Sequence, residues 1–199
     1  MYQSPIDKLI NDISKLPGIG RRSAQRIALF LLKNKDSNLL TLIDSLKLSY
    51  EKIIECDECG NIDMQSPCAI CSNTKRDKSI ICIVEDVSDL WTFERIGFYK
   101  GLYHVLGGSL SAINGIGTED LTINKLINRI KTEKTKEVIL ALSTTMEGQT
   151  TSHVLADKLD SLKNLTVSKL AQGIPIGGEV HYLDENTLNT AFQSRKKII

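Results

Sequence analysis

The sequence lacks the long apolar segments that membrane and secreted proteins carry. No uninterrupted apolar run approaches the roughly 18 residues of a membrane span, and the first residues lack the apolar core of about 7 to 15 residues found in signal peptides. Apolar residues make up 41% of the chain and charged residues 25%, which is close to an average folded protein. We therefore expect a folded, cytoplasmic protein that does not enter a membrane.

Recognisable catalytic elements are also missing. The glycine-rich stretches 107–117 and 173–179 are not followed by the Lys-Ser/Thr pair of a phosphate-binding loop, so both are interpreted as turns. The three histidines, His104, His153 and His181, have no serine or cysteine nucleophile motif beside them, which favours structural roles. These absences argue against nucleophilic catalysis and against a P-loop nucleotide site.

Positive charge is concentrated in the first quarter of the chain. The net charge of the whole sequence is only +1 at pH 7, whereas residues 1–50 contain eight lysines and arginines against four aspartates. The rest of the chain is close to neutral. The amino-terminal part is therefore locally basic, as proteins that contact polyanions often are.

Four of the five cysteines form two closely spaced pairs. Cys56, Cys59, Cys68 and Cys71 follow the pattern C-x2-C-x8-C-x2-C. Two residues between cysteines let both thiolates face one metal ion, and four thiolates complete a tetrahedral zinc site without room for water. The alternatives are disulfides, which are rare in cytoplasmic proteins, or core thiols, which the polar segment does not favour. We predict one structural Zn²⁺ and expect Cys82, within an apolar run, to be a core residue.

Helical periodicity dominates the first 54 residues. The apolar positions of 6–13 predict an amphipathic helix that ends near Leu16-Pro17, and a second stripe predicts a helix from about 21 to 33. Residues 38–54 predict a third helix, or a third and a fourth. The first part of the chain is therefore expected to be a helical hairpin with the sequence PGIG at its turn.

The turn of this hairpin has the features of an anion site. Gly18 and Gly20 allow a ligand to approach the backbone closely, and the free N–H groups that open the second helix point outward. Arg21 and Arg22 begin that helix, and Arg26 lies about one turn later on the same side. The pattern resembles a helix-hairpin-helix, a motif that in its families holds the sugar-phosphate backbone without reading bases. The alternatives are an ordinary hairpin with solvated arginines and a dimerisation hairpin.

From residue 80 onward, apolar strand-like runs alternate with helical patterns. The predicted strands are 80–85, 101–106, 137–143 and 166–171, and the predicted helices lie near 88–96, 122–132 and 148–160. Continuous apolar strands separated by helices are typical of a parallel sheet that is covered on both faces. The fold class is therefore α/β, preceded by a helical hairpin and a zinc loop.

Two acids end the first of these strands. Glu85 and Asp86 stand at the carboxyl end of a parallel strand, where open α/β sheets bind ligands. The stretch resembles the start of a Toprim domain, in which a strand-end glutamate and a later Asp-x-Asp pair hold magnesium. That pair is absent here, and the acid nearest to its place is Glu147. These three acids allow weak Mg²⁺ binding, but the catalytic cluster is incomplete.

The order of these parts resembles the bacterial recombination mediator family RecR over essentially the whole chain. The resemblance rests on LPGIGRRSAQRIA, the four-cysteine loop, IVEDVSDLWTFE, GLYHVLGGSLSAINGIG, MEGQTT and GIPIGGEV. It implies a helix-hairpin-helix region at 1–54, a four-cysteine zinc finger at 55–78, a Toprim domain at 79–172 and a C-terminal tail segment at 173–199.

The resemblance also implies a function. Members of this family are non-enzymatic proteins of the bacterial cytoplasm and nucleoid that form dimers or tetrameric rings and bind single- or double-stranded DNA without sequence specificity. They work with RecO or RecF partners and help load RecA on single strands covered by single-strand-binding protein. By the same resemblance, Gly18, Gly20 and the three arginines Arg21, Arg22 and Arg26 would contact DNA. Apart from the resemblance, we hypothesise that the acidic face with Glu85, Asp86 and Glu147 docks a basic partner protein.

This chain departs from the family pattern at several positions. Arg21-Arg22 replaces the usual Pro-Lys, Ser143-Thr144-Thr145 replaces Asn-Pro-Thr, and Gln149 and Gln172 stand where an acid and an arginine are common. The loss of an acid further weakens any metal-dependent activity. Two rival functions remain: a small Toprim-type nuclease or primase-like enzyme, and a zinc-stapled scaffold that binds only proteins.

Overall fold

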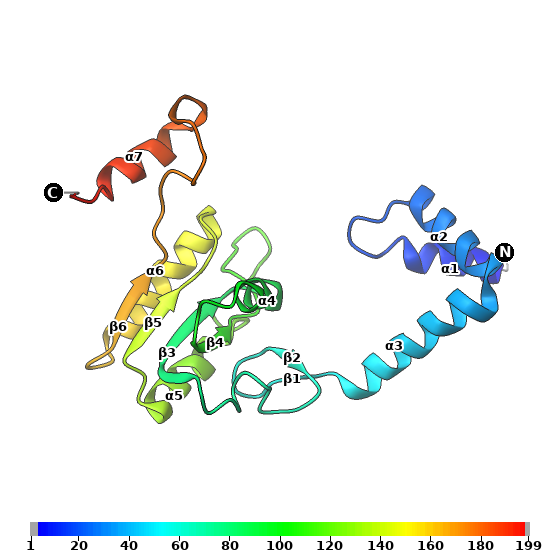
Figure 1. Ribbon diagram of the computed structural model, residues 1–199, viewed down its shortest axis with the longest axis horizontal. Coiled ribbons are helices and arrows are strands. Elements are labelled where there is room, and N and C mark those ends of the chain that lie inside the picture. The colour runs from blue at the N-terminus through cyan, green and yellow to red at the C-terminus, as the bar shows by residue number, and fades with distance from the viewer. Residues whose placement is uncertain (1–3, 198–199) are drawn as a thin grey trace. The chain divides into compact units, whose positions relative to one another are not determined.

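The computed structural model describes residues 4–197, which form two compact units, one up to Ile53 and one from Ile54 onward (Figure 1). The first unit is entirely helical, and the second contains the sheets. The division falls between the last helix of the first unit and the cysteine loop.

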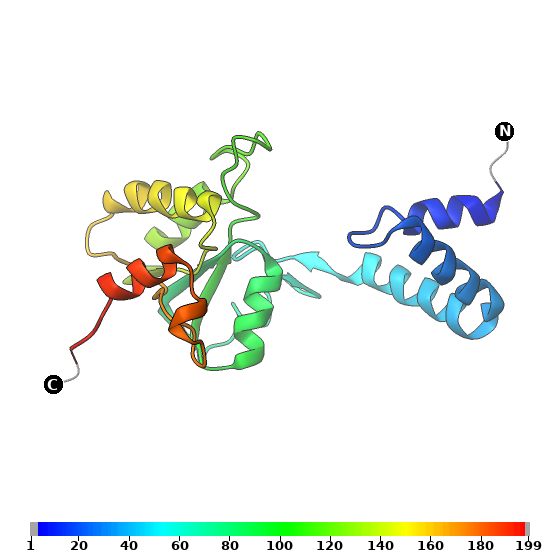
Figure 2. The same cartoon turned by 90° about the horizontal axis from the view of Figure 1, so that it is seen from above.

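The first unit begins with a well-capped helix. In α1 (Pro5–Ile13), the hydroxyl of Ser4 accepts a hydrogen bond from the Asp7 N–H at 3.2 Å, and the proline occupies the first turn, where its missing N–H costs nothing. The chain then turns through Gly18, whose φ of 74° suits glycine. The next helix, α2 (Arg21–Lys33), packs against α1 (Figure 2).

The third helix of this unit follows a distorted turn. The π-helical turn η1 (Lys35–Leu39) leads into α3 (Leu40–Lys52), so the expected helical stretch is one α-helix with an irregular start. Among the described residues of this unit, only Ala24, Ala28 and Leu31 of α2 are buried. Large apolar side chains stay exposed instead, among them Leu29, Phe30, Leu40, Leu42, Leu46 and Leu48. By itself, the helical unit therefore exposes apolar surface to solvent.

The second unit opens with the cysteine loop. Two short strands, β1 (Ile54–Glu55) and β2 (Ile62–Asp63), pair antiparallel around the first cysteine pair. The main sheet follows, with β3 (Asp77–Val84), β4 (Gly101–Val105), β5 (Glu137–Leu140) and β6 (Thr166–Lys169). Its strand order is β4-β3-β5-β6, and each neighbouring pair is parallel.

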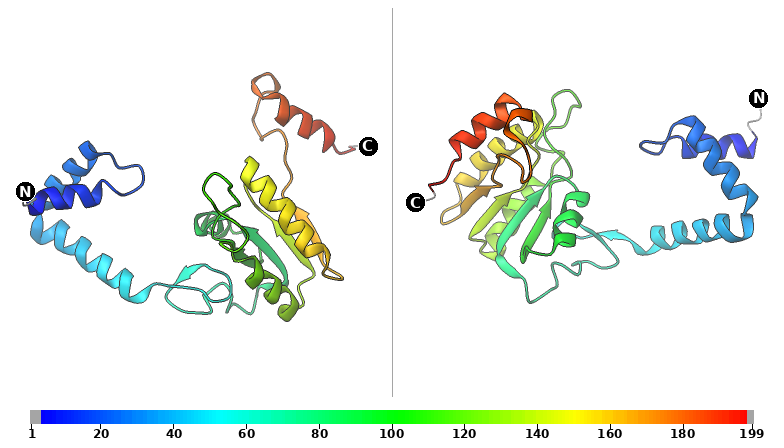
Figure 3. Two further views of the ribbon diagram at one scale, coloured as in Figure 1. Left: turned by 180° about the vertical axis from the view of Figure 1, so that it is seen from behind. Right: turned by 45° about the horizontal axis from the view of Figure 1, so that its top comes forward.

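Helices cover both faces of this parallel sheet. Alternate residues of β3 point to opposite sides, because side chains alternate along a strand. Ile81 and Ile83 join a core with α5 (Ile123–Glu133) and α6 (Met146–Asp160), whereas Cys82 and Val84 join a core with α4 (Val87–Ile96). Figure 3 shows α5 and α6 together on one face. Cys82 is thus a core residue, as expected.

One histidine is sealed inside this unit. His104 on β4 is fully buried, and its Nε2 lies 2.9 Å from the Thr122 hydroxyl. Burial, assisted by the positive charge of Arg129, lowers the pKa of His104 to about 4, so the ring is neutral at pH 7.

The sequence pattern predicted the sheet and its helices, and the structure confirms this α/β arrangement. The predicted limits differ slightly: α6 begins at Met146 because the Thr145 hydroxyl caps it, accepting from the Gly148 N–H at 3.2 Å. The tail carries a 3-10 turn, η2 (Val180–Tyr182), and a helix, α7 (Glu185–Gln193), neither of which was predicted from the sequence. Helix α7 begins after Asp184, whose carboxylate accepts from the Thr187 N–H at 3.0 Å.

Candidate zinc centre and nucleic-acid interface

The four paired cysteines meet at one point. The Sγ atoms of Cys56, Cys59, Cys68 and Cys71 all lie within 4.8 Å of one another, and all four residues are buried. The Sγ atoms of Cys59 and Cys68 are 3.6 Å apart. A disulfide would need about 2.05 Å, whereas the edge of a tetrahedron with Zn–S bonds of about 2.3 Å is about 3.8 Å. The donors therefore fit a tetrahedral zinc ion, and no disulfide joins them.

Backbone amides support the thiolates. The Asn61 N–H donates to Cys59 Sγ at 3.4 Å, and the Cys68 N–H donates to Cys56 Sγ at 3.3 Å. Such bonds favour a negatively charged sulfur, which is the form that binds metal. Gly60, with a φ of 77°, completes the first turn, and a Cβ there would lie 3.2 Å from the Val105 Cβ. The turn therefore requires glycine for both its conformation and its close approach to β4.

A buried arginine links this zinc loop to the α/β core. Arg129 on α5 is only 8% exposed and pairs with Glu133, Nε to Oε1, at 3.1 Å. Its Nη1 donates to the Tyr103 carbonyl at 2.7 Å and to the Glu58 carbonyl at 3.3 Å, while Nη2 lies 3.7 Å from Cys71 Sγ. A zinc ion with four thiolates carries a net charge of −2, so the guanidinium offsets part of that charge at close range.

Two further contacts fasten the loop. The Val105 N–H donates to the Cys59 carbonyl at 2.8 Å, and the Trp91 Nε1–H donates to the Asn61 side-chain oxygen at 3.1 Å. The zinc loop is therefore bonded to β4, α4 and α5. Loss of the metal is expected to affect the α/β core as well as the loop.

We predict that Arg129→Met weakens zinc binding by roughly 10- to 100-fold, the usual cost of removing a partner of metal ligands. The methionine fills part of the space but leaves the Tyr103 and Glu58 carbonyls and the thiolate of Cys71 without their donor. Competition with a chromogenic chelator measures the effect. Asn128→Ala, an exposed change on the same helix, is the matched control. Unchanged zinc affinity in Arg129→Met would contradict this role.

The hairpin turn of the first unit presents its arginines to solvent. Arg21, Arg22 and Arg26 are exposed, and none of them forms an ion pair with another residue in 4–197. Gly20 caps α2 without any side-chain hydrogen bond, so the first amides of the helix lack a side-chain acceptor. No atom lies within 4 Å of a Cβ placed on Gly18 or Gly20. The backbone is therefore open to a ligand on this side of the turn.

The three acids of the α/β unit have different surroundings. Glu85 is half-buried and accepts a hydrogen bond from the Ser143 N–H at 2.7 Å, which ties the ends of β3 and β5 together. Asp86 caps α4, accepting from the Ser88 N–H at 2.9 Å in a capping box with Asp89. Glu147 is half-buried in the first turn of α6.

These acids do not gather into a metal site. Within residues 4–197, the only group of three or more histidine, cysteine or acidic ligand atoms close enough to share an ion is the cysteine cluster. Glu85, Asp86 and Glu147 thus give no support to the weak Mg²⁺ site considered from the sequence. The pocket beside Glu85, about 260 Å³ in volume, is lined by Asp89 rather than by Glu147.

Ser143 and Glu85 leave room only for a glycine at position 148 in the first turn of α6. A Cβ on Gly148 would lie 2.4 Å from the Ser143 carbonyl oxygen and 2.9 Å from Glu85 Oε1. We predict that Gly148→Ala lowers the free energy of unfolding by about 1 to 3 kcal/mol, because backbone must shift to admit the methyl group. Chemical denaturation measures the change, with Thr150→Ala as an exposed control on the same helix. An unchanged midpoint would show that the turn between β5 and α6 adapts freely.

Comparison with known families accounts for each part of the chain. Models of the RecR helix-hairpin-helix, the RecR four-cysteine zinc finger domain, the Toprim domain and the RecR C-terminal region match residues 6–48, 53–73, 79–171 and 173–196, respectively. Relatives named "Recombination protein RecR" match along nearly the full length. Those of Rhodospirillum rubrum and Erythrobacter litoralis are 48% and 44% identical over 198 residues, 100% of both chains. The chain belongs to the RecR family.

Another RecR relative, from Hyphomonas neptunium, is 51% identical over 191 residues, 96% of this chain and 94% of its own. Membership of the RecR family supports a role in recombination and repair. The helix-hairpin-helix match indicates DNA binding, and the zinc-finger match agrees with the thiolate cluster described above. No helix in the described part of the chain is long and apolar enough to cross a membrane.

Arg129 was not predicted from the sequence as a functional residue. A signal was present, because residue 129 falls on the apolar stripe of α5 with Ile123, Leu126 and Ile130, all of which are buried. A charged residue inside such a stripe needs a buried partner. The partners lie on β4 and in the zinc loop, far away in the sequence, so the residue pattern alone could not name them.

Proposed function

We propose that this protein is a DNA-binding recombination mediator that acts with RecO- and RecF-type partners to help load RecA on single-stranded DNA. The observation that carries the proposal is the group of three exposed arginines at the open start of α2, none of which forms an ion pair within residues 4–197. Gly18, Gly20 and the amides of the turn would meet the same phosphates as Arg21, Arg22 and Arg26. Such contacts hold DNA without reading its sequence.

Self-association would make this weak contact useful. The helical unit leaves Phe30 57% exposed and Leu46 61% exposed, and its buried set is small. Apolar surface of this kind favours burial against further copies of the chain. A dimer or a tetrameric ring would present several hairpins to one DNA strand, and the linked contacts would raise the overall affinity.

The partner surface is proposed at the carboxyl edge of the sheet, with Glu85, Asp86 and Glu147. Since Glu85 and Asp86 are already engaged in turns, Glu147 is the acid best suited to contact a basic partner. Beside it, Met146 is 79% exposed and Ile113 is 91% exposed, and these residues border a pocket of about 430 Å³. An acid next to exposed apolar side chains suits protein docking.

A direct test follows the exchange of proteins on DNA. Single-stranded DNA is coated with fluorescently labelled single-strand-binding protein, and RecA is added with a RecO-type partner. We expect this protein to shorten the delay before the label is displaced, and we expect Glu147→Lys to remove most of that effect. An exchange rate that does not depend on this protein would reject the mediator function.

The rival enzyme function has its own test. A Toprim nuclease or primase would cut or extend labelled DNA in the presence of Mg²⁺ or Mn²⁺, and Glu85→Gln would abolish the reaction. We propose that no such reaction occurs, because Glu85 serves the fold and no later Asp-x-Asp pair exists. The other rival, a scaffold that binds only proteins, predicts no gel shift of DNA even at low salt.

The proposed function also predicts where in the cell the protein is found. A protein that holds DNA without sequence preference is expected to accompany the bacterial nucleoid in the cytoplasm. Fluorescence microscopy of the tagged protein tests this location directly. We expect the fluorescence to coincide with the nucleoid, and we expect Arg22→Ala combined with Arg26→Ala to spread it through the cytoplasm.

A further inference from the structure

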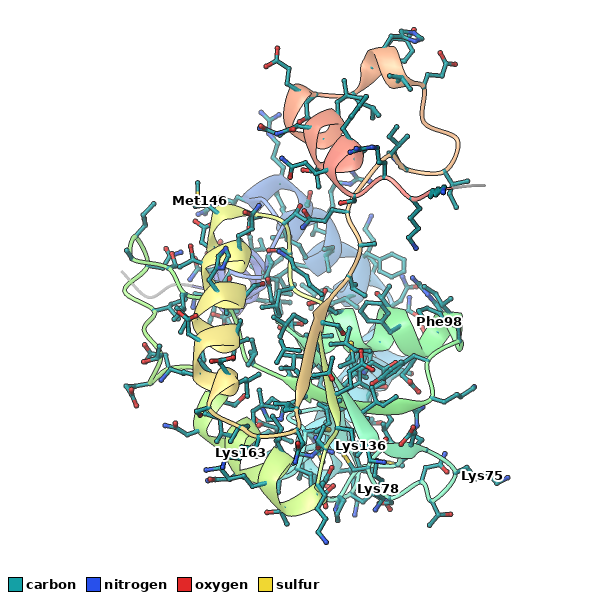
Figure 4. All side chains as sticks on the ribbon, turned by 90° about the vertical axis from the view of Figure 1, so that its left-hand side faces the viewer. Lys75, Lys78, Phe98, Lys136, Met146 and Lys163 are labelled. Carbon is teal, nitrogen blue, oxygen red and sulfur yellow. The ribbon has the colours of Figure 1, made fainter. Side chains whose placement is uncertain are left out.

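A row of lysines lies along one edge of the α/β unit. We name it the lysine rim, and it consists of Lys75, Lys78, Lys131, Lys134, Lys136 and Lys163. All six side chains are exposed. Figure 4 shows Lys163, Lys136, Lys78 and Lys75 in succession along the lower end of the unit, away from Met146 at the start of α6. The rim therefore lies far from the acids that follow β3 and open α6.

The parallel sheet brings these lysines together. The Lys136 N–H donates to the Ser79 carbonyl at 2.8 Å, and the Thr166 N–H donates to the Lys136 carbonyl at 2.8 Å. The amino ends of β3, β5 and β6 are thus aligned at one edge. Because the carboxyl ends of parallel strands share the opposite edge, the six rim lysines lie at one edge of the sheet, and Glu85, Asp86 and Glu147 lie at the other.

The rim surrounds a shallow pocket. Lys131, Lys134, Lys136 and Lys163 line a space of about 400 Å³. Thr135 lines it as well, and its hydroxyl is buried without a hydrogen-bond partner among residues 4–197. The exposed ammonium groups of these four lysines are suited to the oxygens of an anionic ligand.

The charge of the rim is only partly cancelled by its neighbours. No rim lysine forms an ion pair within the described residues. Three acids lie within two residues of a rim lysine: Glu133 pairs with Arg129, whereas Asp77 and Glu137 accept hydrogen bonds from the hydroxyls of Ser79 and Ser168 and keep their negative charge. Arg76, next to Lys75, pairs with Glu94. Six lysines against the two charged carboxylates of Asp77 and Glu137 still leave a positive surface.

The composition of the rim distinguishes between possible partners. Protein interfaces are typically rich in aromatic residues, methionine and arginine and poor in lysine, whereas lysine is a common contact for nucleic-acid phosphates. No large apolar side chain within 72–80, 131–139 or 161–169 is exposed. Favourable placement of cations at helix carboxyl ends explains Lys131 and Lys134 at the end of α5 and Lys163 just after α6, but not Lys75, Lys78 or Lys136.

We propose that the lysine rim is a second contact for the phosphate backbone of nucleic acid, separate from the hairpin arginines. The proposal rests on the proposed DNA-binding function and extends it to the α/β unit. It holds whether or not the hairpin arginines also contact DNA. Because lysines hold phosphates as point charges, the rim would add affinity and salt dependence without base preference.

The test uses the full chain with Lys134→Ala and Lys136→Ala combined. Lys125→Ala with Lys169→Ala, two lysines near the other edge, removes the same charge and serves as the control. Fluorescence anisotropy with labelled single-stranded and duplex DNA is measured over a KCl series. For two lost phosphate contacts, we expect the slope of log K against log salt to become shallower by roughly 1.4 to 1.8. Affinity at low salt should fall several-fold more than in the control.

If the rim variant and the control bind DNA with the same affinity and the same salt slope, the proposal is overturned. That result is also the one expected if the rim binds an acidic protein instead of DNA. Thermal unfolding checks that both variants remain folded. Repeating the series with Arg22→Ala and Arg26→Ala separates the two sites. If only the lysine variant changes the salt slope and the DNA affinity, the rim is a DNA contact and the hairpin is not. If only the arginine variant changes them, the hairpin is a DNA contact and the rim is not.

Discussion

Replacing Arg22 and Arg26 together by alanine is expected to reduce DNA affinity at low salt by at least about ten-fold, since each lost charge-assisted contact is worth roughly 1.5 to 3 kcal/mol. Both side chains are exposed at the open start of α2, without an ion-pair partner among the described residues. Removing two phosphate contacts should also make the salt dependence shallower. Fluorescence anisotropy over a salt series measures both quantities.

A matched control removes the same charge elsewhere in the helical unit. Lys8 and Lys47 are exposed on α1 and α3, so Lys8→Ala with Lys47→Ala should leave the salt dependence nearly unchanged. Because all four residues are exposed, both variants are expected to stay folded, and circular dichroism checks this. If the arginine variant binds as tightly as the control, with the same slope, the hairpin is not the DNA contact.

Removing the metal is expected to have the largest effect on stability. Apparent binding free energies of structural zinc reach about 10 to 16 kcal/mol at pH 7, and part of that energy holds loops that cannot fold alone. Cys59→Ser should abolish stoichiometric zinc and lower the midpoint of thermal unfolding by more than about 10 °C. The contacts from Arg129 and Val105 carry this loss into the α/β core.

Cys82 provides the control for this change. It is buried in the core with Val84 and Leu90 rather than in the thiolate cluster, so Cys82→Ala should cost packing energy but retain one zinc per chain. Metal content and unfolding are measured on both variants. A zinc-free Cys59→Ser protein that melts at the same temperature as the parent would contradict the structural role of the metal.

Local sequence rules predicted those features of the fold that short segments determine. The apolar stripe predicted a helix from about 21 to 33, and α2 spans Arg21–Lys33. The four cysteines were found by their spacing, because a tetrahedral site needs two close pairs. Parallel strands were evident from their continuous apolar runs.

Features that depend on distant residues could not be predicted in this way. Arg129 meets Glu58 and Cys71 only because α5 folds beneath the zinc loop. The rim lysines come from three separate segments that the sheet aligns. Glu85 had the pattern of a magnesium ligand, yet its carboxylate accepts from Ser143, and only the structure reveals that bond.

Light scattering of the full chain, with and without a labelled single-stranded oligonucleotide, tests most directly whether several hairpins in one closed assembly hold a single DNA strand. We expect a dimer or larger species in both cases, and one DNA strand bound by several copies of the chain. A monomer whose mass is unchanged by DNA would contradict this mode of binding.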